Sequence, residues 1–200
     1  MQSEEPPATA QPPDDEDVRL MQLSGAGDMR AFEQLVERHQ NLVIGTIGRM
    51  LGNSSEVEDL AQQVFIRVWK NAGRYVARAK FTTWLLTITR NLVFNELRRR
   101  RRHNAVPLQV DDEGEERPIA DEQTHEPDAA LLERELDEAI RAAIAALPES
   151  QRMAVVLRRY EQLSYDEIAE VLGQTVPAVK SLLFRARTEM REKLSKYLNR

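Results

Sequence analysis

Cysteine is absent from the 200-residue sequence, and histidine occurs only three times. Without cysteine there can be no disulfide bonds and no thiolate metal sites, which fits a reducing compartment. The histidines are too far apart along the chain to form a ligand pair on one helix, so the sequence predicts no metal centre. They are His39, His103 and His125.

Glycine, proline and aromatic contents are also low, whereas 42% of the residues are hydrophobic. That combination favours a helical fold over a turn-rich β fold. No apolar run approaches the roughly 20 residues that span a bilayer. The N-terminus has no basic segment followed by an apolar one, so it does not look like a signal peptide. We therefore predict a soluble, cytoplasmic protein without membrane insertion.

The overall charge is negative (−5, with a sequence pI near 5.4), yet five consecutive arginines close the amphipathic segment that begins at Phe81. A helix dipole favours one or two cations at a helix C-terminus, worth about 0.3–1 kcal/mol each. Five adjacent arginines repel one another, so a bound polyanion explains them better than a solvated helix end does. The run comprises Arg98, Arg99, Arg100, Arg101 and Arg102.

Hydrophobic residues recur at steps of three and four over most of the chain, which is typical of amphipathic helices. Two stretches lack this pattern, residues 1–16 and 104–128, and both are acidic and contain several prolines. The sequence predicts an all-α fold of two small helical domains, at 17–103 and 129–200, joined by an acidic flexible linker. The first 16 residues are predicted to form a disordered acidic tail.

Two capping boxes are predicted at helix starts, one formed by Ser55 with Glu58 and the other by Ser164 with Glu167. In a capping box, the two side chains satisfy backbone amides that have no partner within the helix. The helix that begins at the second box is short and is predicted to end at Gly173. Glycine readily adopts the left-handed conformation that ends a helix.

A further helix is predicted directly after this glycine turn, with Thr175 as its N-cap. Helix, glycine turn and helix with outward cations together favour a helix-turn-helix over a hairpin with a solvated charged face. Side chains near the start of the second helix can reach base edges in DNA, and the later arginines can neutralise phosphate. The candidate DNA-binding residues are Thr175, Pro177, Lys180, Ser181, Phe184, Arg185 and Arg187.

Three blocks resemble one family. The block "LPESQRMAVVLRRYEQLSYDEIAEVLGQTVPAVKSLLFRAR" closely resembles the promoter-binding C-terminal domain of bacterial extracytoplasmic-function (ECF) sigma factors. The blocks "EDLAQQVFIRVWK" and "FTTWLLTITRNLVFNELRRR" resemble the most recognisable parts of their N-terminal domain. The resemblance covers nearly everything after residue 17.

The resemblance implies a protein that is not an enzyme and needs no cofactor. It implies binding to RNA polymerase core through the β′ clamp and the β flap, recognition of the −10 and −35 promoter elements, and help in melting the DNA. The helix-turn-helix residues would bind the −35 element. An anti-sigma factor is the further partner that the resemblance implies. The acidic linker would thread through the polymerase channel, although a spacer kept soluble by its charge is the equal alternative.

By resemblance to the family, the binding site for the −10 element is assigned to the helix that ends in the five arginines and to the loop at 73–80. Asn91 and Asn95 are four residues apart and therefore share one helix face, and asparagine can pair with adenine through two hydrogen bonds. The family captures a base flipped out of the stack there. The five arginines would bind phosphates of the same DNA. Phe81 and Trp84 are predicted to be core residues, with stacking of Trp84 on a base as the alternative.

Polymerase binding is assigned by resemblance to an earlier helix, through Glu58, Asp59, Gln62, Gln63 and Arg67. The sequence departs from the family at three places. Gln63 stands where glutamate is common, Leu182 stands where a basic residue is common, and the loop at 73–80 lacks the usual small polar residues.

Two other functions are considered. A helix-turn-helix regulator that acts without polymerase would leave the asparagine and arginine helix without a role. An acid-dependent enzyme is disfavoured because the paired carboxylates, at 58–59 and 166–167, lie at helix starts where capping explains them. The sequence contains no nucleophile–base pair and no glycine-rich phosphate loop.

Overall fold

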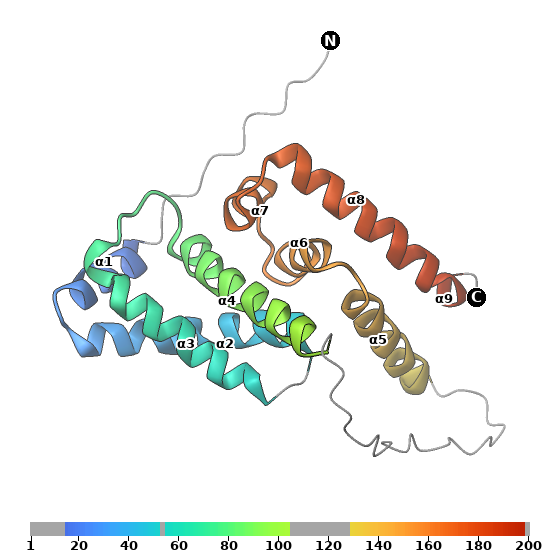
Figure 1. The fold of residues 1–200 in the computed structure, drawn as a ribbon, viewed down its shortest axis with the longest axis horizontal. Helices are drawn as coiled ribbons and strands as arrows, with labels where there is room; N and C mark the ends of the chain where they lie inside the picture. Colours follow the sequence, from blue (N-terminus) through green and yellow to red (C-terminus); the bar gives the residue numbers. More distant parts are fainter. Residues whose placement is uncertain (1–14, 53–54, 105–128, 199–200) are drawn as a thin grey trace, which may run out of the picture.

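The computed structural model describes residues 15–52, 55–104 and 129–198, and within these ranges every regular element is a helix (Figure 1). The all-α prediction is confirmed. The predicted linker and nearly all of the predicted tail lie outside the described residues, so their assignment remains a prediction. The helices are α1 (Asp15–Gly25), α2 (Met29–Leu51), α3 (Glu56–Asn71), the 3-10 turn η1 (Ala72–Arg74), α4 (Phe81–Asn104), α5 (Ala129–Ala145), α6 (Glu149–Arg159), α7 (Tyr165–Leu172), α8 (Val176–Lys193) and α9 (Ser195–Leu198).

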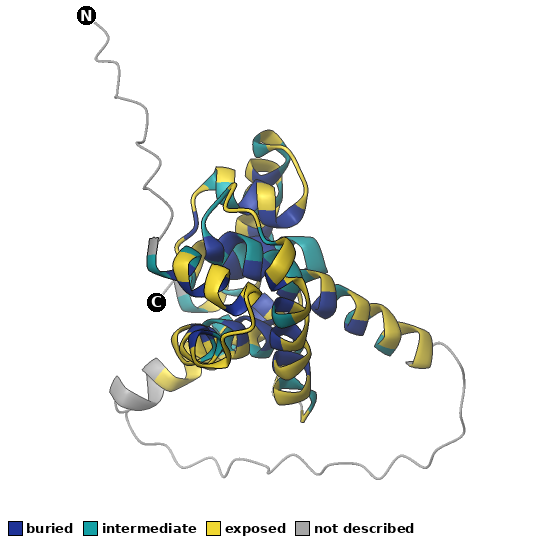
Figure 2. Cartoon of the chain, turned by 90° about the vertical axis from the view of Figure 1, so that its left-hand side faces the viewer, coloured by how far each residue is buried: buried dark blue, intermediate teal, exposed yellow. Residues whose placement is uncertain are grey.

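The N-terminal half, residues 15–104, packs α1, α3 and α4 around the long helix α2. Asp28 begins α2 by accepting hydrogen bonds from the backbone amides of Arg30 (2.9 Å) and Ala31 (3.2 Å). Buried residues gather where the helices face one another (Figure 2). The apolar residues with at most 1% exposure are Met21, Leu35, Val43, Ile47, Met50, Val64, Val68, Phe81, Leu85, Leu86 and Val93.

The capping box predicted at Ser55 and Glu58 is wrong. Ser55 has helical backbone angles (φ −58°, ψ −16°), and its side chain makes no capping hydrogen bond. A capping side chain reaches the first free amides only from an extended backbone. The acidic residues Glu56, Glu58 and Asp59 in the first turn of α3 are instead placed where the helix dipole favours negative charge.

A buried carboxylate ties α1 to α2. Asp17, 1% exposed, lies 2.9 Å from Arg38 Nε and 2.8 Å from His39 Nε2. The His39 ring packs against Phe81 at 5.1 Å between ring centres, so the same cluster supports the start of α4. A buried carboxylate is tolerated when it is paired in this way.

The C-terminal half, residues 129–198, packs α6, α7 and α8 together, with α5 alongside. It also packs against the N-terminal half, mainly through α7 on α4 and α6 on α2. Figure 1 shows α4 lying between the α2–α3 pair and the α6–α7 pair. Most buried apolar residues of the two halves therefore form one continuous cluster, from which Ala143, Ile144, Leu147 and Ala186 are absent.

Candidate nucleic-acid interface

An exposed polar stripe runs along α4. Asn91, Asn95, Arg98 and Arg102 are all exposed, and none is packed inside the protein. At about 100° per residue, these four positions fall within one narrow arc of the helix. Arg98 Nη1 donates to Asn95 Oδ1 at 3.4 Å, which links the amide to the guanidinium on the same face. The stripe therefore presents two amides and two cations to solvent.

The other three arginines of the run, Arg99, Arg100 and Arg101, form ion pairs with carboxylates of the protein. Arg99 and Arg100 both pair with Glu96, at 2.8 Å and 3.2 Å, and with Glu56 of α3, each at 2.5 Å. Hydrogen bonding from Arg99 is the main cause that lowers the pKa of Glu96. Arg101 forms an ion pair with Glu149 of α6. Carboxylates of the protein thus balance part of the charge for which the sequence suggested an external polyanion.

The loop that precedes α4 is built on an aromatic cluster. Tyr75 packs edge-on against Trp84 at 5.0 Å between ring centres, and Phe81 lies 5.8 Å from Trp84. Phe81 is 1% exposed and Trp84 is half-buried, so both pack in the protein as predicted. Burial raises the pKa of Tyr75, and the nearby Asp17 adds to this shift.

The predicted helix-turn-helix is present in α7 and α8. Ser164 and Glu167 form the predicted capping box, with Ser164 N donating to Glu167 Oε2 at 2.8 Å and Glu167 N donating to Ser164 Oγ at 3.3 Å. Gly173 ends α7 in the left-handed conformation (φ 62°). Thr175 caps α8, because its hydroxyl accepts from Ala178 N at 3.4 Å. Pro177 lies in the first turn of α8, as predicted.

All the side chains predicted to bind the −35 element are exposed, and they lie on α8 or, for Thr175, at its N-cap. Phe184 is 69% exposed, which is unusual for a large aromatic residue and leaves it free to contact a partner. Leu182 is half-buried and packs toward the core, so its apolar side chain serves packing. The exposed residues of this face are Thr175, Pro177, Lys180, Ser181, Phe184, Arg185 and Arg187.

The structure divides the predicted polymerase-binding residues between two sides of α3. Glu58 and Gln62 line an apolar groove between α2 and α3, of about 610 Å³. Three of its hydrophobic residues are well exposed: Met29 (54%), Ile44 (38%) and Ile66 (50%). Asp59, Gln63 and Arg67 instead line a polar cleft of about 430 Å³ against α4, together with Asn95 and Arg99.

Sequence reasoning did not single out these exposed apolar residues or the carboxylate partners of the arginines. Glu96 could have been found, because it precedes Arg99 and Arg100 by three and four positions, the spacing of ion pairs on a helix. Glu56 could not have been identified from the sequence as a partner of these arginines, because it lies in another helix. Within the described ranges, no three histidine or acidic side chains are grouped to hold a metal ion, and no helix is long and apolar enough to cross a membrane.

Comparison with known proteins identifies the two halves. Residues 35–103 match sigma-70 region 2, and residues 137–190 match sigma-70 region 4. The chain is 35% identical over 175 residues to the RNA polymerase sigma-H factor of Pseudomonas aeruginosa, covering 86% of this chain and 91% of the relative. It is 33% identical over 174 residues to the ECF RNA polymerase sigma factor SigW of Bacillus subtilis, covering 84% and 91%.

A solved structure has the same fold. It is the sigma factor RpoE of Bartonella quintana, crystallised with the anti-sigma factor NepR, with a TM-score of 0.62 and 22% identity over 84% of this chain and 98% of that one. The presence of both sigma-70 regions argues against a stand-alone helix-turn-helix regulator. The chain therefore belongs to the ECF sigma factors, which recognise promoters for RNA polymerase.

Proposed function

We propose that the two exposed polar surfaces divide promoter recognition between them, with α4 binding the −10 element and α8 binding the −35 element. The observation that carries this proposal is that Asn91, Asn95, Arg98 and Arg102 form one exposed stripe on α4. Amides that can pair with a base edge stand beside cations that can pair with the adjoining phosphates. The loop at 73–80 would contribute to the same site.

Within the arginine run, we propose different roles for different residues. Arg98 and Arg102 bind phosphate, whereas Arg99 and Arg100 hold α4 against α3 through Glu56, and Glu96 of α4 pairs with the same two arginines. The distances of 2.5–3.2 Å between these groups support a structural role. Arg101 has a carboxylate partner in the C-terminal half and would be released for DNA only if that contact opens.

On α8, Lys180, Ser181 and Phe184 would read −35 bases, and Arg185 and Arg187 would bind the flanking phosphates, with Thr175 and Pro177 at the start of the helix. The first residues of a recognition helix lie deepest in the major groove, so base contacts are expected there. The exposed Phe184 ring is suited to apolar contact with a thymine methyl group.

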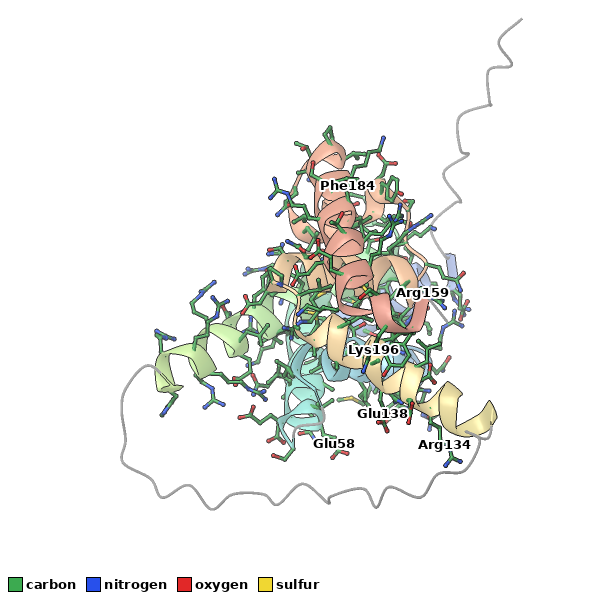
Figure 3. All side chains as sticks on the ribbon, turned by 90° about the vertical axis from the view of Figure 1, so that its right-hand side faces the viewer. Glu58, Arg134, Glu138, Arg159, Phe184 and Lys196 are labelled. Carbon is green, nitrogen blue, oxygen red and sulfur yellow. The ribbon has the colours of Figure 1, made fainter. Side chains whose placement is uncertain are left out.

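The groove between α2 and α3 is the proposed docking site for the β′ clamp of polymerase core. Its exposed apolar floor and the rim residues Glu58 and Gln62 fit an apolar helix face with polar edges. Figure 3 shows Glu58 and Phe184 at opposite ends of the molecule, so this groove and the recognition helix can be occupied together. By resemblance, the C-terminal half would contact the β flap.

An anti-sigma factor is proposed as a regulator, because a structural neighbour was crystallised with one. A protein that places an apolar helix face in the α2–α3 groove would compete with the β′ clamp.

Gel filtration with core polymerase and run-off transcription test the function. The chain should co-migrate with core and direct transcripts from a promoter selected in vitro with the reconstituted holoenzyme. Ile66→Lys should weaken core binding, because it places a charge in the apolar groove, while Glu33→Lys on the exposed surface of α2 serves as the control. Absence of both co-migration and transcripts with the wild-type chain would refute the proposal.

A further inference from the structure

Helix α1 packs against the segment that connects α3 to α4, and none of the proposed DNA and polymerase contacts involves it. Figure 1 shows α1 beside that connection, and the two meet at the 3-10 turn η1. The chain continues from η1 into the loop at 73–80, which the proposed function places at the −10 site. The contacts between α1 and this connection therefore bear on promoter recognition.

The C-terminal end of α1 lies directly against the backbone of η1. A Cβ atom at Gly25 would be 2.9 Å from the backbone oxygen of Ala72 and 3.2 Å from the Cα atom of Gly73. Both distances are shorter than ordinary van der Waals contact, and backbone atoms cannot rotate away as a side chain can. The close approach of the two backbones therefore requires glycine at position 25.

The carbonyl that Gly25 approaches also fixes the start of the loop. The Tyr75 amide donates to the backbone oxygen of Ala72 at 3.1 Å, and this bond closes η1 before the chain becomes extended at Tyr75. A shift of the Ala72 carbonyl would therefore move the point at which the chain enters the loop. Tyr75 is half-buried and anchors the loop, whereas Arg74, Val76 and Arg78 are exposed.

A second contact of α1 reaches the same anchor through the aromatic cluster. Asp17 lies 2.8 Å from His39 Nε2 of α2, and the His39 ring packs against Phe81 at 5.1 Å between ring centres. Phe81 in turn lies edge-on to Tyr75 at 6.0 Å. Because Asp17 is only 1% exposed, it depends on being paired, and the pairing fixes the His39 ring against Phe81.

We propose that α1 is a positioning element for −10 recognition, in which Gly25 sets the backbone of η1 and Asp17 holds the aromatic anchor of the loop. Asp17 is buried and Gly25 lies against η1, so both act through Tyr75 and not by touching DNA. The inference rests on the proposed function, which assigns the loop at 73–80 to the −10 site. A recognition site must hold its groups to within about 0.5 Å, so a small displacement of the loop should change base preference.

Base preference of the holoenzyme tests this inference. A promoter selected in vitro with wild-type holoenzyme is changed one base at a time in both elements, and fluorescence anisotropy measures the affinity for each DNA. With the wild-type chain, a wrong base at a recognised position should weaken binding by at least about fivefold. Gly25→Ala should reduce that ratio to about twofold at −10 positions, because the loop is displaced, and should leave it unchanged at −35 positions.

Gly48→Ala is the matched control. It makes the same substitution at a glycine in α2, where an added Cβ would have open space around it, so both ratios should stay at wild-type values. Unchanged −10 ratios in a folded Gly25→Ala chain would overturn the proposal. Equal losses at −10 and −35 positions would overturn it too, because they would mean that α1 supports only the fold as a whole.

Asp17→Asn tests the second contact. It keeps the shape of the side chain but removes the charge that pairs with Arg38 and His39, so it should also lower discrimination at −10 positions only. Glu16→Gln removes the neighbouring carboxylate, whose side chain is 44% exposed, and should leave both ratios unchanged. A folded Asp17→Asn chain with wild-type −10 ratios would overturn the role assigned to Asp17.

Hydrogen exchange in the free chain gives a readout that does not depend on polymerase or DNA. The Tyr75 amide should lose protection in Gly25→Ala, because its acceptor on Ala72 is displaced, whereas the Ile47 amide in the core of α2 should keep its protection. Wild-type protection of the Tyr75 amide in Gly25→Ala would overturn the proposal. A loss of protection over all the helices would do the same.

Asn95→Ala in the same binding assay separates this inference from the proposed function. If Asn95→Ala loses −10 discrimination and Gly25→Ala and Asp17→Asn do not, only the positioning role of α1 is refuted. If the wild-type holoenzyme has no base preference at −10 positions, or if Asn95→Ala leaves that preference unchanged, the proposed assignment of α4 to the −10 element is refuted.

Discussion

Arg99 and Glu56, which lie 43 positions apart in the chain, meet with 2.5 Å between guanidinium Nη2 and carboxylate Oε1. Glu96 joins the same cluster from within α4. The contact changes the interpretation of the arginine run, since two carboxylates of the protein already balance the charge of Arg99 and make it less available to DNA. Arg98 and Arg102 are the members of the run on the asparagine face.

Arginines on different faces of α4 should respond differently to substitution. Replacing Arg98 and Arg102 with alanine should reduce the slope of log K against log salt by about 1.8 for duplex contacts, because each lost phosphate contact contributes about 0.9. Replacing Arg99 and Arg100 with glutamine should keep the slope and lower the free energy of unfolding, because their ion pairs with Glu56 and Glu96 are weakened. Fluorescence anisotropy of holoenzyme on labelled promoter DNA and urea unfolding measure the two effects. Equal slope losses in both variants would mean that all four arginines reach phosphate.

Glu96 should make stability depend on pH on the acid side. Its pKa is lowered in the fold, chiefly by hydrogen bonding from Arg99, so the fold favours the carboxylate. The stabilisation is therefore present above the ordinary pKa of glutamate and is lost as the pH falls through the lowered pKa. Glu96→Gln should reduce the free energy of unfolding by about 0.5–1 kcal/mol at pH 7 and by much less near pH 3.

Urea unfolding at the two pH values checks the Glu96 prediction. Glu33→Gln, on the exposed surface of α2, is the control and should follow the wild type at both values. A constant difference between Glu96→Gln and wild type from pH 7 to pH 3 would show that ionisation of this carboxyl does not stabilise the fold.

Two serines that look alike in sequence should differ in their effect on stability. Ser164→Ala removes a hydroxyl that accepts from Glu167 N and should lower the free energy of unfolding by about 1 kcal/mol. Ser55→Ala should change it by only a few tenths of a kcal/mol, because the Ser55 side chain makes no capping hydrogen bond. Thermal unfolding of both variants compares them, and a loss at Ser55 as large as at Ser164 would show that Ser55 does cap α3 in solution.

Phe184 should affect specificity without affecting folding. Its ring is 69% exposed, so Phe184→Ala removes little buried area. If it contacts a −35 base, the variant should lose about 1–3 kcal/mol of discrimination at one base position. Binding of the holoenzyme to a set of −35 variants measures this, with circular dichroism as the check on folding. A uniform loss over all sequences would place Phe184 outside base recognition.

Local features of the sequence predicted much of the fold. The periodicity of apolar residues predicted the helices, and the Ser164–Glu167 box and Gly173 predicted where α7 begins and ends. These signals succeed because a cap or a left-handed glycine acts on amides and carbonyls within a few residues. The prediction of a cap at Ser55 failed because the backbone before α3 is helical at that residue. The serine hydroxyl reaches the first amides of the helix from an extended backbone.

The sequence by itself determined the helical class, the helix-turn-helix and the family, because each is encoded by residues close together in the chain. Only the tertiary structure decided which arginines pair with carboxylates of other helices, which side of α3 carries the apolar groove, and that Arg90 reaches Val171. These depend on the packing angles of α3 and α7 against α4. Contacts between residues 43 or 81 positions apart arise from that packing, and no local pattern of residues specifies them.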